Sequence, residues 1–174
     1  MKYLHGPQFL ELFHQCKTAC HLETQDHYNV PDETEPIRRF LAGEPDDYSW
    51  FDDWTDLVVQ AKSRGATMSR IRVVTVPHTD YHRWLLHLTA QNMAAGEDIR
   101  YLQRDMVGAD EIPADDWWLF NNEQVVFNLM DSDGVPVGGA STTDPQIVQR
   151  CRATRDRLWE RAVKYHEYVD QQTR

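Results

Sequence analysis

The sequence lacks the features that mark membrane and secreted proteins. Its longest apolar runs, such as VVTV (73–76) and WLLHL (84–88), are far shorter than the roughly 20 residues that span a bilayer. The first residues, MKYLHGPQFLELF, lack the apolar core and the small-residue cleavage site of a signal peptide. We therefore expect a cytoplasmic protein that does not enter a membrane.

Cysteine and basic charge are also scarce. The three cysteines (Cys16, Cys20 and Cys151) form no disulfide framework, and Cys16 and Cys20 fall on the apolar face of an expected helix, which favours buried thiols. The formal net charge is −10, and residues 1–60 carry 12 acidic side chains against 4 basic ones. Direct nucleic-acid binding needs a basic surface, so we expect none. The acidic first half suits solubility or, alternatively, a basic protein partner.

Motifs of the common enzyme and cofactor families are missing as well. The chain has no Walker loop and no GxGxxG or GxSxG sequence. His78, Asp80 and His82 form an HxDxH pattern that could ligate a transition metal. However, Pro77 and the start of a helix would turn these side chains apart, and Asp80 suits the first turn of that helix. We expect no metal site and no cofactor.

The clearest structural signal present runs from Met68 to Gln103. It reads as a strand, a turn at Pro77, an amphipathic helix capped by Thr79, a glycine stop at Gly96 and a second strand. The connection is long enough for a right-handed crossover, which predicts a parallel βαβ unit. Such a unit would form the centre of the fold.

The remaining elements are expected to extend this unit into one α/β domain over residues 1–174. The pattern predicts helices before the unit, an extended or β segment at 19–28, a hairpin of strands after it, and a C-terminal helix of about 25 residues that begins at Asp144. The Gly138–Gly139 pair is expected to mark a bulge. The prediction is a mixed sheet of about five strands, namely 69–76, 97–103, 116–120, 124–130 and 135–141.

Charged residues of the βαβ unit supply the candidate ligand-binding site. Arg70 and Arg72 alternate with apolar residues along the first strand, so their side chains share one face. They could form ion pairs on an exposed sheet rim, which contribute little each, or they could hold an anion. We favour the ion pairs and keep the anion pocket as the alternative. The candidate ligand-binding residues are Arg70, Arg72, Asp80, Tyr81, Glu97, Arg100 and Asp116.

Two other readings of the acidic groups remain. Glu97 or Asp116 beside the arginines could act as an acid–base group of an enzyme. Glu23, Asp26, His27 and Tyr28 form another polar cluster, which we interpret as a solvated rim.

A homo-oligomeric scaffold is a third hypothesis for the whole protein.

Several segments of the chain carry a resemblance to a known family. These segments are TACHLETQDHY (18–28), RRFLAGEPDDYSW (38–50), RIRVVTVPHTDYHRW (70–84), NMAAGEDIRYL (92–102), DDWWLFNNEQVVF (115–127) and RDRLWERAV (155–163). With them the chain resembles an actinobacterial family of uncharacterised proteins over nearly its whole length. The order of elements also looks like half of a phospholipase D-type fold, but the HxK pair of that fold is missing, because His166 is followed by Glu167 and Tyr168.

The resemblance implies a role through a partner. Members of that family are commonly encoded beside helix-turn-helix regulators. We therefore expect a non-enzymatic accessory or sensor module that acts with a DNA-binding transcriptional regulator and binds a small anionic ligand. The alternative is a small-molecule enzyme that uses a carboxylate beside an arginine pocket.

Overall fold

The segment from Thr67 to Gln103 forms the predicted βαβ unit in the computed structural model, which describes residues 1–172. Strand β3 (Thr67–Val74), helix α4 (Asp80–Ala95) and strand β4 (Asp98–Gln103) follow one another, and β3 pairs with β4 in parallel. The Thr79 side chain caps α4 by accepting a hydrogen bond from the His82 backbone N–H. Gly96 ends the helix with a φ of 119°, a conformation that favours glycine.

This unit lies at one side of a mixed sheet with the strand order β1-β7-β6-β5-β2-β3-β4-β8. Strands β2, β3 and β4 are parallel, and all the other pairs are antiparallel. The other strands are β1 (Lys2–Leu4), β2 (Thr18–Glu23), β5 (Trp117–Phe120), β6 (Gln124–Met130), β7 (Pro136–Thr142) and β8 (Val163–Lys164). The other helices are α1 (Gly6–Gln15), α2 (Thr34–Ala42), α3 (Asp52–Ser63), α5 (Pro145–Arg161) and α6 (Tyr165–Gln172).

The α/β class and the mixed sheet were predicted correctly, but the sheet has eight strands and not about five. The extended segment after Ala19 is a full central strand, β2. The two outermost strands, β1 and β8, contain three and two residues, which is too short for an alternating pattern to be detectable. No helix within residues 1–172 has the length and apolar character needed to cross a membrane.

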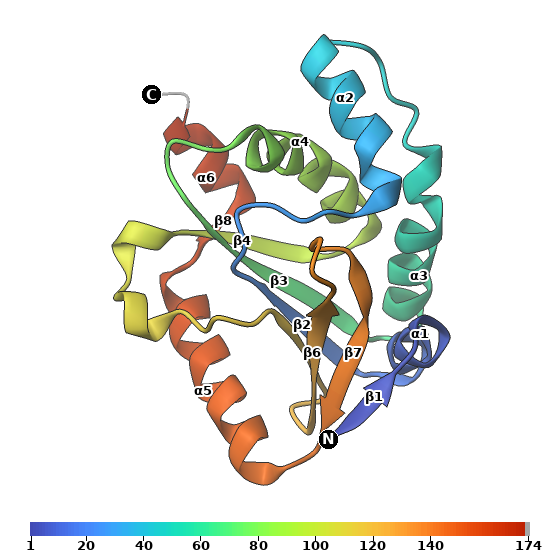
Figure 1. The fold of residues 1–174 in the computed structure, drawn as a ribbon, viewed down its shortest axis with the longest axis vertical. Coiled ribbons are helices and arrows are strands. Elements are labelled where there is room, and N and C mark those ends of the chain that lie inside the picture. The colour runs from blue at the N-terminus through green and yellow to red at the C-terminus, as the bar shows by residue number, and fades with distance from the viewer. Residues whose placement is uncertain (173–174) are drawn as a thin grey trace.

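Helices cover both faces of the sheet. In Figure 1, α5 lies on one side and α1 and α3 lie on the other. Strand β5 shows how its sequence serves both layers: Trp117 and Leu119 pack with Leu158 of α5, whereas Trp118 and Phe120 pack with Phe13 of α1. A strand buried on both faces reads as a continuous apolar run, as WWLF does.

The hairpins after the βαβ unit match the sequence prediction. Asn121 and Asn122 both have positive φ, 53° and 58°, in the tight turn between β5 and β6. The register between β6 and β7 shifts next to Leu129, opposite Gly138. A Cβ on Gly138 would lie 2.5 Å from the backbone oxygen of Leu4, so glycine is needed where β1 approaches the bulge.

Two predicted boundaries were wrong. Strand β3 ends at Val74, not at 76, and Val76 is exposed. The C-terminal helix is not continuous for about 25 residues, because α5 ends at Arg161 and Ala162 adopts an extended conformation. Short strand β8 then pairs with the edge of β4. Helix α6 follows and stacks Tyr168 on Tyr101 of β4, with ring centroids 4.8 Å apart.

Candidate functional site

The register of the parallel strands brings charged side chains together on the face covered by α1, α3 and α4. His21 of β2 lies beside Arg70 of β3, and Glu23 lies beside Arg72. Side chains in register on neighbouring strands point to the same face of a sheet. The side chains of these two residues on each strand therefore point to the same face, where they form a buried cluster of opposite charges.

Glu23 is the centre of this cluster because it binds both arginines. Its Oε2 accepts a hydrogen bond of 2.6 Å from Nε of Arg72, and its Oε1 accepts one from Nη1 of Arg70. Burial alone would raise the pKa of Glu23, but the two guanidinium groups hold that pKa well below its usual value. Glu23 is therefore ionised although only 8% of it is exposed.

Glu97, the residue just before β4, provides the second carboxylate. Its Oε2 lies 3.2 Å from Nε and from Nη2 of Arg70. Its Oε1 accepts hydrogen bonds from Nε1 of Trp54 at 2.6 Å and from Nδ2 of Asn92 at 2.7 Å. The guanidinium of Arg70 also lies over the rings of Trp54 and Trp118, at 5.6 and 5.4 Å from their centroids. Arg70 and Glu97 are thus held in place by neutral side chains as well as by their ion pair.

The hydrogen bonds of Arg72 extend to α4 and β4. Its Nη1 donates to Oγ1 of Thr89 at 2.6 Å and to the hydroxyl of Tyr101 at 3.1 Å. These contacts link the network to the helix that crosses over the sheet. The arginines were predicted to pair on an exposed rim, and the pairing is present, but both are buried, with 8% and 3% of their surface exposed. The helices that cover this face account for the difference.

The structure brings some of the predicted site residues together and separates the others. Arg70, Arg72 and Glu97 share the network, and Tyr81 lies at the same cavity. Arg100 is paired in register with Ile71, so it points to the opposite face, where its guanidinium stacks on Trp159 of α5 at 3.9 Å. Asp80 is exposed and pairs with Arg83.

Asp116 lies just before β5 and is bound to the segment that follows β2. Its Oδ1 accepts hydrogen bonds of 2.8 and 2.7 Å from the backbone N–H and the hydroxyl of Thr24, and its Oδ2 accepts one from the hydroxyl of Tyr28. Burial raises the pKa of Asp116. Asp116 therefore orients Tyr28 at the side of the cavity and does not contact the arginines.

A cavity of about 620 Å³ lies above the network, between the sheet and its covering helices. This volume is typical of small-molecule sites. Its walls come from α1, α3, α4 and the β6–β7 hairpin, and include Phe9, Phe51, Trp54, Leu85, Leu88, Trp118 and Val137. Its polar lining includes His21, Glu23, Tyr28, Glu33, Arg70, Arg72, Tyr81, Asn92 and Asn128. Burial lowers the pKa of His21, whose ring stacks on Trp118 at 4.2 Å, so this imidazole is neutral at pH 7.

Glu33 differs from the other carboxylates of the cavity. It lies at the end of a short 3-10 helix (Pro31–Glu33) and accepts a hydrogen bond of 2.7 Å from the hydroxyl of Tyr81. No ion pair to Glu33 occurs among residues 1–172. Burial raises the pKa of Glu33 to about 7, so this group changes its charge near neutral pH.

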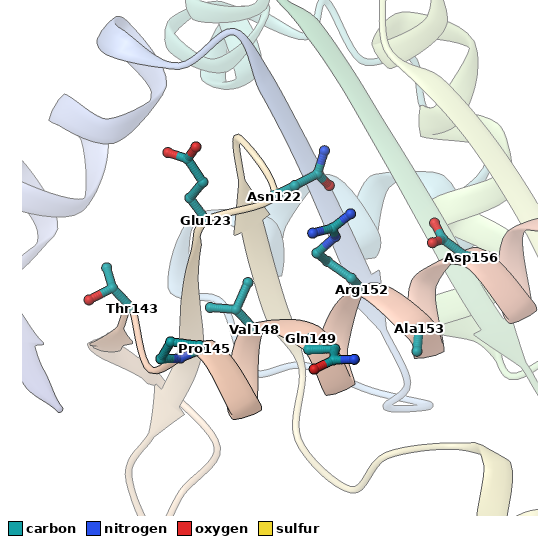
Figure 2. Close-up of a pocket in the computed structure, with 9 residues that line it drawn as sticks. All are labelled: Asn122, Glu123, Thr143, Pro145, Val148, Gln149, Arg152, Ala153 and Asp156. Atoms are coloured by element: carbon teal, nitrogen blue, oxygen red, sulfur yellow. The ribbon is translucent and has the colours of Figure 1, made fainter.

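A second hollow, of about 630 Å³, lies between the β5–β6 turn and the start of α5 (Figure 2). Its lining includes Glu123, Gln149, Arg152 and Asp156. Most of these side chains are exposed and Val148 is its one buried lining residue, so the hollow is a solvated surface groove. The central cavity is the better candidate because its polar groups are buried and converge.

The rings of His78 and His82 lie edge to face, 6.2 Å apart between centroids, but Asp80 of the HxDxH pattern pairs with Arg83 instead. His78 contacts the backbone oxygen of Thr75 and the hydroxyl of Tyr168, both at 3.0 Å, whereas His82 lies 3.8 Å from Asp26. Within the described part of the chain, no group of three His, Cys, Asp or Glu side chains is arranged to hold a metal ion. Residues 78–82 serve to turn the chain from β3 into α4.

Comparison with known protein families matches residues 7–170 to the family described as Domain of unknown function (DUF6879). The chain belongs to the DUF6879 family. A search of curated proteins finds no match to this DUF6879 chain. The matched range includes every residue that lines the central cavity except Gly6.

Sequence reasoning missed the residues that complete this DUF6879 site. Glu23 was assigned to a solvated rim, but it is the buried centre of the ion-pair network. Trp54, Trp118 and Glu33 were not named as candidate site residues. The usable signal was the shared spacing of His21 and Glu23 with Arg70 and Arg72, because strands paired in parallel would bring the two pairs together.

Removing Glu23 tests the network. We expect Glu23→Ala to lower the free energy of unfolding by about 3–5 kcal/mol, because it leaves two buried guanidinium groups without their shared carboxylate. Glu35→Ala is the matched control: Glu35 is exposed and pairs with Arg38 and Arg39, so its loss should lower the free energy of unfolding far less than the loss of Glu23 does. Urea unfolding measures both. Equal losses in the two variants would contradict the buried network.

Proposed function

We propose that this protein is a non-enzymatic sensor module that binds a small molecule in the cavity above the Glu23–Arg70–Arg72–Glu97 network. The observation that carries the proposal is the cavity itself, of about 620 Å³, with apolar walls and a small number of converging polar groups. Such a combination is the usual form of a ligand site. The polar groups come from different elements and are held in place by their own hydrogen bonds, so the site is preformed.

The fixed positions of the charged groups favour binding over catalysis. Glu97 and Asp116 were the candidate acid–base groups, and each accepts hydrogen bonds from at least two protein donors. Their lone pairs are directed toward protein partners. An acid–base group must reach the proton that it transfers, and Glu97 does not line the cavity.

An enzyme remains the second candidate, and Glu33 is the observation that favours it. Glu33 lines the cavity, and burial raises its pKa to about 7, which is the range of a general acid or base working near neutral pH. In that case Glu33, and not Glu97 or Asp116, would transfer the proton. Tyr81 would hold its carboxyl group in position.

Extraction of copurifying small molecules, followed by mass spectrometry, tests the binding proposal. Val137 lines the cavity and is 44% exposed, so Val137→Trp should block the opening without disturbing the core. Val59 is 51% exposed on α3 and does not line the cavity, so Val59→Trp is the control. We expect a small molecule to accompany the wild type and the control and to be lost from Val137→Trp.

The same extraction separates the two candidates. Recovery of the same compounds from the wild type and Val137→Trp would contradict the cavity proposal. A ligand whose mass stays unchanged after incubation with the protein supports the sensor module. Conversion of the ligand by the wild type, abolished in Glu33→Gln, would establish the enzyme instead.

We further propose that the module acts on a helix-turn-helix regulator, as its resemblance to proteins encoded beside such regulators implies. Support comes from the acidic surface of the N-terminal half, where Asp47, Asp52, Asp53 and Asp56 are exposed around the start of α3. Such a surface suits a basic partner.

A pull-down from native lysate with mass spectrometry tests this partnership. We expect a helix-turn-helix protein to be recovered with the wild type, and its recovery to fall when Asp52, Asp53 and Asp56 are changed together to Asn. Replacement of Glu123, Asp156 and Glu160, exposed acids elsewhere on the surface, is the control. Recovery of no regulator would count against this part of the proposal.

A further inference from the structure

The charges around the central cavity do not balance within the protein. Three carboxylates, Glu23, Glu33 and Glu97, surround two guanidinium groups, Arg70 and Arg72. The arginines are paired with Glu23 and Glu97. Glu33 only accepts a hydrogen bond from the neutral hydroxyl of Tyr81. When Glu33 is ionised, the cavity therefore has one carboxylate in excess, and the partner that is missing is a cation.

A buried hydrogen-bond acceptor points to the same kind of ligand. Asn92 lines the cavity and is 2% exposed, and its Oδ1 has no hydrogen-bond partner among the described residues. Because its Nδ2 donates to the carboxylate of Glu97 at 2.7 Å, the orientation of the amide is fixed. A buried acceptor without a partner is costly, so this oxygen requires a donor from a ligand or a water.

A second amide of the cavity shows the same pattern. Oδ1 of Asn128, on β6, is also buried without a partner, and this residue lines the same cavity. The polar atoms still available to a ligand from these two amides are thus acceptors. The guanidinium charges, in contrast, are already balanced.

The aromatic side chains around Glu33 also suit a cation. The rings of Tyr28 and Tyr81 lie 5.8 Å apart, and Phe51 and Trp54 line the same cavity. Aromatic faces attract cations through their ring quadrupoles, and the attraction strengthens when water is excluded. These rings would also contact the apolar body of a ligand.

We propose that the ligand of the central cavity is an organic amine, with a protonated nitrogen that pairs with Glu33, an apolar or aromatic body against the tyrosines and tryptophans, and N–H donors for the amide oxygens of Asn92 and Asn128. This inference rests on the proposed function and names its ligand class. It replaces the anion expected from the arginines, whose charges are balanced by Glu23 and Glu97.

Three probes of similar size distinguish the ligand classes: benzylamine, benzyl alcohol and benzoate. Their dissociation constants for the full chain can be measured by titration calorimetry or ligand-observed NMR. We expect benzylamine to bind at least tenfold more tightly than benzyl alcohol, with benzoate the weakest. Benzoate binding as tightly as benzylamine, or no binding of benzylamine at millimolar concentration, would overturn the inference.

Substitution of Glu33 shows whether the preference comes from this side chain. Glu33→Gln keeps the size of the residue and an oxygen for Tyr81, and it should weaken benzylamine about tenfold while leaving benzyl alcohol unchanged. Glu35→Gln, two residues away and exposed, should change neither. An equal benzylamine affinity in the wild type and Glu33→Gln would contradict the pairing.

The pH dependence gives a readout that a purely structural role of Glu33 would not change. Benzylamine stays protonated from pH 6 to pH 8, whereas Glu33 ionises within this range, so wild-type affinity should rise several-fold with pH. The Glu33→Gln profile should be flat. The variant leaves the other titratable and charged groups around this part of the cavity unchanged, namely His21, Glu23, His27, Tyr28, Arg70, Arg72, Tyr81 and Asp116.

The two proposals can fail separately. Suppose that a compound copurifies with the wild type, is lost from Val137→Trp and carries a carboxylate or phosphate. This result would support the sensor-module proposal and contradict the proposal of an amine ligand. A cavity that takes no compound at all would overturn both.

Discussion

The bond between Glu23 and two arginines is the constraint on which the arrangement of the sheet face depends. The parallel pairing of β2 and β3 places Glu23 beside Arg72 and two positions from the partner of Arg70. Each guanidinium group needs a carboxylate because it is buried. Glu97 supplies the second carboxylate that balances the two guanidinium charges. It also connects α3 and α4 through Trp54 and Asn92. Glu23 thus ties β2 to β3, and Glu97 links the same network to α3 and α4.

The same network determines what the cavity above it can bind. Both arginines are buried and each is paired with a carboxylate, so we infer that they form the floor of the cavity rather than a receptor for anions. Glu33 lies outside the network, and its burial without a cation raises its pKa to about 7. The group with unsatisfied charge is therefore at the cavity wall, beside the aromatic rings, which is where a ligand would complete the site.

The central fold could be predicted from the sequence because its signals are local. Thr79 and Asp144 as helix caps, Gly96 as a helix stop and Asn121–Asn122 as a turn each depend on a few neighbouring residues. The site depends on strand order instead. Arg70 follows Glu23 by 47 positions along the chain, and only the β2–β3 register shows that they meet. Likewise, Arg100 was grouped with Arg70 by spacing, although its register position turns it to the other face.

The account requires that two glutamates on one cavity have opposite behaviour, with Glu23 ionised by its arginines and Glu33 left without a cation. Carboxyl carbon NMR of protein labelled at glutamate, recorded over a pH titration, measures this directly, and Glu23→Gln and Glu33→Gln assign the two signals. The account predicts that Glu23 stays ionised to a pH well below the usual range of glutamate, while Glu33 titrates near pH 7. Titration of Glu23 in the ordinary range, or of Glu33 at the value of an exposed glutamate, would contradict it.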